Sequence, residues 1–431
     1  MPIFIPRPMT MTTTAPSLAV AGPLAGTGGR LDYLDATRAF ALILGIVFHA
    51  ALSFLPIFIG WAVQDVSTGI LPGIFAMISH SFRMETFFLL AGFFSRLTFH
   101  RHGTGDFIRS RLLRIGVPFL IGWFLLRPLL VSGFVMGGAS LRGSVDVWAG
   151  LREGFQSLST LPAGIFTGTH LWFLYYLALI TALALLAHGL LSAAAPGKAF
   201  LLRRGDALVA WLAKTPLGIP LLALPTAAAL WFMQAWGMDT PDRSLAPHLP
   251  VLAIYGGFFL FGWMLSRQRE LIVAFARLTP LRWILAGLAS AAVLWLSGFE
   301  RDPSHRHYFA AHVAYALAYA LLMWSLVALT IGIFHKLCPR PNASVRYIAD
   351  SSYWMYLLHL PVVIWLQVAV AEWPLHWSLK LPLISAATIA LCLLTYDLFV
   401  RSTFIGRILN GRPRERVILP WIARRLSRTS N

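Results

Sequence analysis

The sequence predicts an all-α integral membrane protein with about ten transmembrane helices. Of its 431 residues, 58% are hydrophobic and 12% are charged, whereas soluble domains contain about 45–50% apolar residues. Apolar segments close to the roughly 20 residues needed to cross a bilayer recur along the whole chain. Lys and Arg gather in alternate loops between these segments, a pattern typical of multi-pass membrane proteins.

These apolar segments define the predicted spans and their orientation. They cover residues 35–57, 73–95, 115–136, 170–192, 216–236, 250–266, 281–298, 308–334, 353–372 and 381–400. With the N-terminus in the cytoplasm, 27 of the 35 Lys and Arg residues fall in cytoplasmic segments. This bias predicts N-in and C-in ends and an even number of crossings.

The membrane domain is predicted over residues 34–400. Residues 1–33, rich in Ala, Thr, Pro and Gly, are expected to form a disordered cytoplasmic tail, and residues 401–431 a basic cytoplasmic tail. The longest loop on the outer side, residues 137–169, joins spans three and four. Its stretch DVWAGLREGFQSL has helical apolar spacing, which predicts a helix on the membrane surface or over a cavity.

Charge and cysteine content argue against a nucleic-acid partner, a disulfide and a metal site. The net charge of +18 is explained by a polybasic face against the lipid bilayer, so no nucleic-acid partner is expected. Cys338 and Cys392 have no disulfide or metal-ligand spacing. No metal and no tightly bound cofactor are expected, and self-association is left open.

His49 and Glu85 are ionisable residues at membrane depth, where such side chains are costly and often functional. His49 lies eleven residues beyond Arg38, about 16 Å deep in its span. Glu85 lies eleven residues before Arg96 in a span that runs the opposite way, so the two depths match. We expect a dyad in which Glu85 orients His49 as a general base. The alternative is that His49 only bonds the backbone of a neighbouring helix and that Glu85 pairs with Arg83 or another buried cation.

Other polar and aromatic side chains in the spans are weaker candidates. Arg127 either lines a cavity and binds an anion or reaches the outer interface. Arg83 and Glu85, two residues apart, point to different sides of their helix. The remaining candidates either face a cavity or belong to helix interfaces and the aromatic belt; they are His170, Trp172, Tyr356 and His359.

Arg109, Arg111 and Arg114 concentrate positive charge at the cytoplasmic end of span three. Guanidinium groups bind phosphate through paired hydrogen bonds, so this cluster is a candidate site for a phosphorylated donor such as coenzyme A. The alternative is a topology signal alone, which is the better interpretation on composition.

Five motifs occur in one order along the chain. They are LDATRAFALILGIVFH, METFFLLAGFF, RSRLLRIGVP, HLWFL and SSYWMYLLHLPV. Together they resemble the membrane acyltransferase-3 family over about residues 31–405. The AGF variant and the C-terminal YDLFVRSTFIGRILNGRP look most like the glucans biosynthesis protein C branch of that family.

The resemblance assigns roles to individual residues. Arg38 and His49 match the family's Arg, ten residues, His pattern, and Glu85 matches the acidic position of the second motif, where Ala91 replaces the more usual serine. Residues that match the Arg-x-x-Arg, fourth-span and late-span motifs are Arg111, Arg114, His170, Trp172, Tyr356 and His359.

The resemblance implies an acyl-CoA-dependent O-acyltransferase of the bacterial inner membrane. Succinyl-CoA or acetyl-CoA would be the co-substrate, bound through Arg111 and Arg114, and a periplasmic glucan or another glycan would be the acceptor, entering under the loop at residues 137–169. Succinyl transfer is the specific expectation. Arg83 or Arg127 would then stabilise the oxyanion or bind the distal carboxylate of the succinyl group.

Three alternatives stay open. A transporter or flippase for an acyl donor or glycan intermediate would use the buried charges without any covalent change. An O-acetyltransferase acting on another cell-envelope polysaccharide would share the mechanism. A lipid-linked glycosyltransferase is least favoured, because acidic residues on the outer side are few and scattered.

Overall fold

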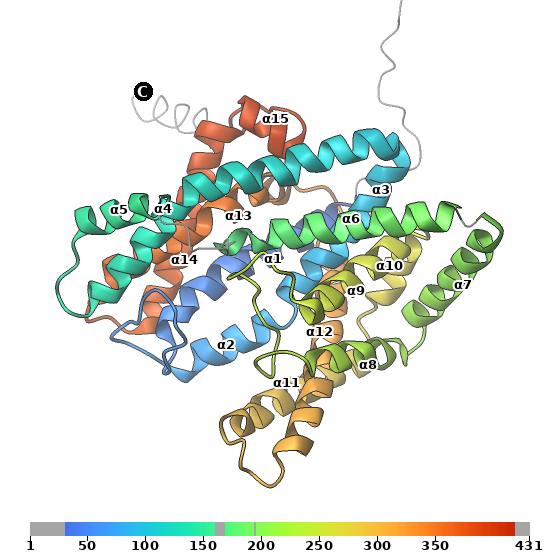
Figure 1. Ribbon diagram of the computed structural model, residues 1–431, viewed down its shortest axis with the longest axis horizontal. Coiled ribbons are helices and arrows are strands. Elements are labelled where there is room, and N and C mark those ends of the chain that lie inside the picture. Colours follow the sequence, from blue (N-terminus) through green and yellow to red (C-terminus); the bar gives the residue numbers. More distant parts are fainter. Residues whose placement is uncertain (1–30, 160–168, 194, 419–431) are drawn as a thin grey trace, which may run out of the picture. The chain divides into compact units, whose positions relative to one another are not determined.

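The structure, a computed structural model, describes residues 31–159, 169–193 and 195–418, and all regular structure in these residues is helical (Figure 1). Most of the predicted N-terminal tail and the end of the C-terminal tail lie outside the described residues. The helices are α1 Asp32–Ala51, α2 Ile70–His80, α3 Arg83–Arg111, α4 Val117–Ser140, α5 Val147–Gln156, α6 Trp172–Ala193, α7 Ala195–Lys214, α8 Gly218–Leu230, α9 Leu249–Leu265, α10 Glu270–Phe275, α11 Pro280–Leu296, α12 Tyr308–Leu337, α13 Ala343–Val370, α14 Trp377–Thr395 and α15 Phe404–Asn410.

Seven stretches of the described residues are long and apolar enough to cross a membrane, or eight if α7 and α8, which meet at a 111° bend, form one span. This number is below ten because the 71-residue stretch Ile70–Ser140 contains two predicted spans, and because α9 has only 17 residues. The all-helical, multi-pass class is confirmed. The number ten and the N-in, C-in orientation stay predictions.

The span predicted over residues 73–95 is not one continuous helix. α2 ends at His80 and α3 begins at Arg83. Phe82, between them, has φ −138°, outside the helical range. Arg83 and Glu85 therefore lie in the first turn of a new helix.

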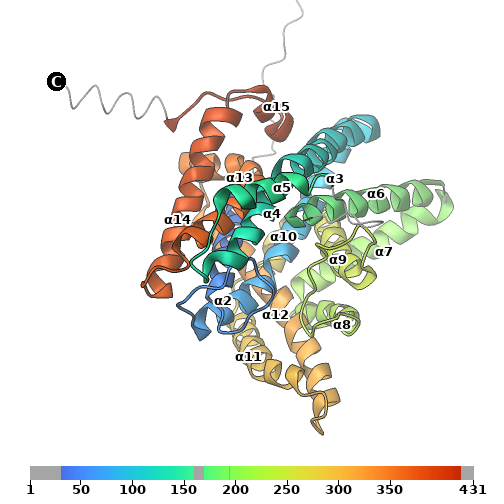
Figure 2. The same ribbon diagram turned by 60° about the vertical axis from the view of Figure 1, so that its left-hand side comes forward.

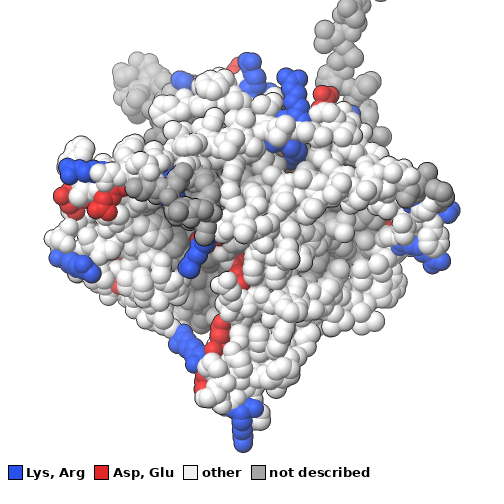
Figure 3. Space-filling model, in the orientation of Figure 1, with Lys and Arg blue, Asp and Glu red and all other residues white. Residues whose placement is uncertain are grey.

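The surface of the described helices is largely apolar. Leu120, Phe124 and Leu125 of α4 are 60%, 58% and 65% exposed. Figure 3 shows one face on which uncharged side chains cover most of the area between the charged groups. Exposed apolar side chains of this extent are expected where helices contact lipid chains.

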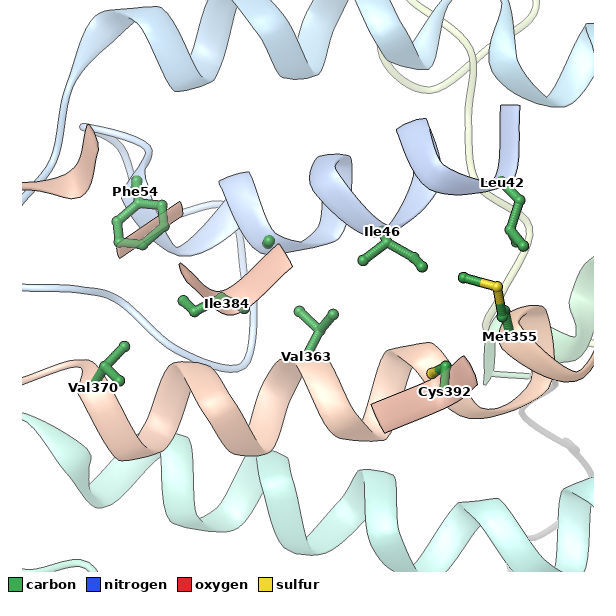
Figure 4. Close-up of a cluster of buried hydrophobic side chains, with 9 residues drawn as sticks. Leu42, Ile46, Phe54, Met355, Val363, Val370, Ile384 and Cys392 are labelled. Carbon is green, nitrogen blue, oxygen red and sulfur yellow. The ribbon is translucent and has the colours of Figure 1, made fainter. Parts of the chain in front are cut away.

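α1 packs against α13 and α14, and a cluster of buried side chains joins the three helices. In Figure 4, Leu42 and Ile46 of α1 point toward Met355 and Val363 of α13. Each of these four side chains is at most 4% exposed. This packing fixes the position of α1, which carries His49.

α3 and α9 approach each other closely through glycines. A Cβ at Gly92 would lie 1.9 Å from the Phe259 carbonyl oxygen, and a Cβ at Gly262 would lie 1.9 Å from the Leu89 carbonyl oxygen. Only glycine fits at both positions, which is a common way for membrane helices to come into contact.

α5 lies beside α4 in both views (Figures 1 and 2). It forms the helix predicted within residues 137–169, and Trp148 on it is 78% exposed. Gly154 of α5 allows this contact, because a Cβ there would lie 2.3 Å from the Pro128 carbonyl oxygen. Residues 160–168 of the same loop lie outside the described residues.

Candidate active site

A cavity of about 1800 Å³ lies along α1. The α1 residues that line it recur every three or four positions, the spacing of one helix face, and they are Arg38, Ala41, Leu42, Gly45, Phe48 and His49; Leu52, in the 3-10 turn after α1, continues the stripe. This stripe extends over roughly 21 Å of helix, against a hydrocarbon core of about 30 Å. Ten of the eleven predicted site residues line the cavity, and Glu85 is the exception.

His49 lies in the middle of the stripe, among aromatic rings. Its imidazole stacks on the Trp61 indole with ring centroids 5.5 Å apart and an angle of 17°. The His359 ring is 5.4 Å away. Nδ1 of His49 is buried and has no hydrogen-bond partner among the described residues. A histidine that lines a cavity and whose ring makes no hydrogen bond to the described residues suits proton transfer.

Gln367 connects His49 to Trp61. Its Nε2 donates to the backbone carbonyls of His49 at 2.9 Å and Ala50 at 3.1 Å, and its Oε1 accepts from the Trp61 indole N–H at 2.9 Å. Trp61 is thereby held against the imidazole. Sequence reasoning missed both residues, because Trp61 lies outside the predicted spans and a single glutamine in α13 carries no motif.

His359 and His170 continue the polar wall beyond His49. The two rings are 5.8 Å apart. Nδ1 of His359 lies 2.7 Å from the Tyr356 carbonyl oxygen, and Nε2 of His170 lies 3.0 Å from the Leu357 carbonyl oxygen. Since a carbonyl oxygen only accepts, these ring nitrogens carry the protons. The other nitrogen of each neutral ring is then an acceptor.

Glu85 does not form the expected hydrogen bond with His49. Both of its carboxylate oxygens are buried and accept no hydrogen bond from the described side chains. Its electrostatic neighbours include Arg83, Tyr255 and Tyr319. Two positions along a helix correspond to about 200° of rotation, so when Arg83 faces the cavity Glu85 faces away. The equal depth predicted from the sequence left this rotation undetermined.

Arg83 and Arg127 both line the cavity, at 6% and 7% exposure. The Arg83 guanidinium lies 4.2 Å from the centre of the Phe48 ring. The Arg127 guanidinium lies 5.1 Å from the centre of the Trp123 ring, and its Nε donates to the Ser157 carbonyl at 3.3 Å. Arg127 is therefore held by the end of α5, while Arg83 lies beside His49.

Arginines gather at one end of the cavity. Arg111 ends α3, and Arg114 lies in the π-helical turn Leu112–Gly116 that joins α3 to α4. The Arg114 carbonyl accepts a hydrogen bond from Tyr353 of α13. Arg38 pairs with Asp35 at 3.3 Å and also lines this part of α1. The arrangement offers several guanidinium groups to an anionic ligand.

A polar segment between α8 and α9 lines the other end, and sequence reasoning missed it. Asp239 accepts backbone hydrogen bonds from Gln234 at 2.7 Å and Ala235 at 3.2 Å. His80 joins the segment to α2 through a 2.9 Å contact with the Met238 carbonyl. Burial raises the pKa of Asp242. The residues of this segment on the cavity wall are Gln234, Ala235, Gly237, Met238, Asp239, Thr240, Pro241, Asp242, Arg243, Ser244, Ala246, Pro247 and His248.

The entrance expected under residues 137–169 stays a prediction. Of the described residues in that loop, Thr169 lines the cavity. The polar run QAWGMDTPDRSLAPH is a sequence feature that could have indicated this part of the cavity wall. Taken one by one, its acidic residues are few and scattered.

Trp172 and Tyr356 complete the wall. The Trp172 indole stacks on the Tyr255 ring at 5.7 Å, and the Tyr356 hydroxyl donates to the His170 carbonyl at 2.8 Å. Within the described residues, no group of three or more His, Cys, Asp or Glu side chains is arranged to hold a metal ion. The wall thus combines an arginine end, a histidine centre and a hydroxyl- and carboxylate-bearing end.

Known proteins place this chain in one family. A family model described as an acyltransferase domain matches residues 31–397. Glucans biosynthesis protein C from Salmonella typhi is 24% identical over 388 residues, which cover 88% of this chain and 94% of that protein. The protein of the same name from Salmonella paratyphi B is 22% identical over 406 residues, with the same coverage. No solved structure matches the chain. Because the family model covers most of the chain, the protein belongs to the membrane acyltransferase-3 family, as its motifs predicted.

Proposed function

We propose that this protein transfers an acyl group from cytoplasmic acyl-CoA to a hydroxyl group of a glycan on the other side of the bacterial inner membrane. The observation that carries the proposal is the cavity along α1, which joins an arginine end to a polar end through His49. A membrane acyltransferase with reactants in two compartments needs such a connection at the depth of its catalytic group.

The arginine end suits the donor. Arg38, Arg111 and Arg114 line the cavity together, and guanidinium groups bind the phosphates of coenzyme A through paired hydrogen bonds. The pantetheine arm would extend along the α1 stripe, whose other residues are largely apolar. The thioester carbon would then reach His49.

His49 is the proposed general base. It takes the proton from the acceptor hydroxyl as the oxygen attacks the thioester carbon, so that a C–O bond forms and the C–S bond breaks. The departing coenzyme A thiolate accepts a proton, which restores the neutral imidazole. Gln367 and Trp61 hold His49 in place, a role that the sequence had assigned to Glu85.

The polar end suits a hydroxyl-rich acceptor. Carboxylate, amide and hydroxyl groups between α8 and α9 can exchange hydrogen bonds with sugar hydroxyls. The name of the Salmonella relatives, glucans biosynthesis protein C, favours a glucan. We propose a periplasmic glucan as the acceptor and succinyl as the acyl group.

Transfer of a labelled acyl group tests the proposal. Purified protein in lipid nanodiscs would receive succinyl-CoA or acetyl-CoA, labelled in the acyl group, together with periplasmic glucan. We expect label in the glucan with the wild type and a loss of at least about 100-fold with His49→Ala, the usual effect of removing a general base.

His312→Ala is the matched control. His312 stacks between Trp231 at 4.2 Å and Trp236 at 4.7 Å and does not line the cavity. The His312→Ala variant should transfer the labelled acyl group to the glucan at the wild-type rate. Normal transfer by a folded His49→Ala variant would contradict the mechanism, and label from acetyl-CoA alone would identify an O-acetyltransferase. Movement of a donor or glycan across the bilayer without label in the glycan would identify a transporter.

A further inference from the structure

Arg83 is a buried cation without a counter-ion. Its side chain lines the cavity, yet the residue is only 6% exposed. No carboxylate of the described residues lies within 4 Å of it, and its buried Nη1 has no hydrogen-bond partner there. An unpaired buried charge costs several kcal/mol in the low dielectric of a protein interior. Such a charge in a membrane helix is expected to serve a ligand.

The fold holds Arg83 in this position by two features. α3 restarts at Arg83 after the break at Phe82, so the side chain leaves the first turn of the helix. The side chain packs against α1 at Gly45, where a Cβ would lie 3.5 Å from the Arg83 Cδ, an ordinary van der Waals distance. The guanidinium then rests over the Phe48 ring at 4.2 Å.

The groups around Arg83 do not neutralise it. Glu85 is near enough for an electrostatic interaction but forms no ion pair with it among the described contacts. The histidines within electrostatic range, His49, His80 and His359, are neutral or cationic. Within the described residues, Arg83 therefore has electrostatic neighbours but no ion-pair partner.

Arg83 lies close to the proposed catalytic group. Phe48 is shared between them: the His49 ring centre is 5.0 Å from the Phe48 ring centre, and the Arg83 Cζ is 4.2 Å from it. His49 and Arg83 are thus separated by at most about 9 Å. A four-carbon acyl group holds its two carboxyl carbons about 4 Å apart. A group of this length can therefore place one carboxyl carbon near His49 and the other near Arg83.

We propose that Arg83 binds the free carboxylate of the acyl group and so selects short acyl donors that end in a carboxylate. This inference rests on the proposed function and narrows it. Of the two arginines that the sequence offered for this role, Arg127 is already bonded to the end of α5. Arg83 has the open donor and the place beside His49.

The test compares succinyl-CoA with butyryl-CoA, which has the same chain length but no carboxylate. The wild type should prefer succinyl-CoA in kcat/KM by about 10- to 100-fold, the range of one charge-assisted hydrogen-bonded pair. Arg83→Met should bring the ratio close to one, and Arg83→Lys should keep part of it. Arg127→Met is the matched control and should keep the wild-type ratio.

Two results would overturn the inference. One is a wild type that does not discriminate between the donors. The other is an Arg83→Met variant that slows both donors equally, which would identify Arg83 as an oxyanion stabiliser.

Donor binding to His49→Ala separates this inference from the proposed function. If no variant transfers label but succinyl-CoA still binds about 10- to 100-fold more tightly than butyryl-CoA, and only while Arg83 is present, the proposed function fails and carboxylate recognition stands. Equal binding of the two donors contradicts carboxylate recognition even if transfer occurs.

Discussion

Lys380 and Arg83 are both buried cations, but their surroundings differ completely. The Lys380 Nζ lies 2.8 Å and 3.0 Å from the two carboxylate oxygens of Asp65 and 3.2 Å from the Ala371 carbonyl oxygen. The two side chains are 0% and 1% exposed. Arg83 is buried almost as deeply and faces a cavity with no carboxylate from the described residues within 4 Å.

The difference separates a structural charge from a functional one. Asp65 belongs to the segment that joins α1 to α2, so its pair with Lys380 ties this segment to α14. Nothing is left for a ligand to bind. Arg83 joins no second element by an ion pair in the described residues, and its charge is available to a substrate. The presence or absence of a partner, rather than burial, distinguishes the two roles.

Breaking the paired charge should have the largest effect on stability. Asp65→Ala leaves Lys380 buried and unpaired, which is expected to lower the free energy of unfolding by about 3–5 kcal/mol. Chemical unfolding in detergent would measure this loss. The ratio of succinyl-CoA to butyryl-CoA transfer at a temperature where the variant is folded should stay unchanged, since the pair does not line the cavity.

Asp206→Ala is the control for the buried pair. Asp206 accepts a 2.8 Å hydrogen bond from Arg267, but the two side chains are 23% and 25% exposed. A partly exposed pair is worth about 1 kcal/mol or less. Equal losses for the two Asp→Ala variants would refute the structural role assigned to Lys380.

Gln367→Leu should have an intermediate effect on stability and a clear effect on turnover. It removes the hydrogen bonds to the His49 and Ala50 carbonyls and to the Trp61 indole, at a cost of about 1–3 kcal/mol. Gln367 is a positioning residue, so we expect kcat to fall by roughly 10-fold as the catalytic geometry loosens. The KM for acyl-CoA should not change. Steady-state kinetics that show a raised KM with normal kcat would argue against this role.

The sequence predicted the depth of the site but not its rotation. Counting residues from Arg38 placed His49 in the middle of its span, and the structure has it in the middle of the cavity wall. The same counting matched Glu85 to His49, but depth does not determine which way a side chain faces, and the helix restarts at Arg83. The residues that match the family motifs line the cavity, with the exception of Glu85.

Partners distant in sequence could not be predicted. Lys380 lies just before the span predicted over residues 381–400, yet it is fully buried in α14, because Asp65, far away in sequence, compensates its charge. The contribution of the segment between α8 and α9 likewise depends on how the helices assemble. That Arg83 forms no ion pair with the described residues can be seen only from the assembled structure.

Arg83→Met should cause the smallest loss of stability, and this result would sharpen the comparison most. The substitution removes an uncompensated charge, which favours the folded state, and loses the contact of the guanidinium with Phe48, which is worth about 0.5–2 kcal/mol. Because removing the charge outweighs losing this contact, the free energy of unfolding should not fall. A loss as large as that of Asp65→Ala in the same unfolding experiment would show that Arg83 is paired in the folded protein, and its charge would then be structural like that of Lys380.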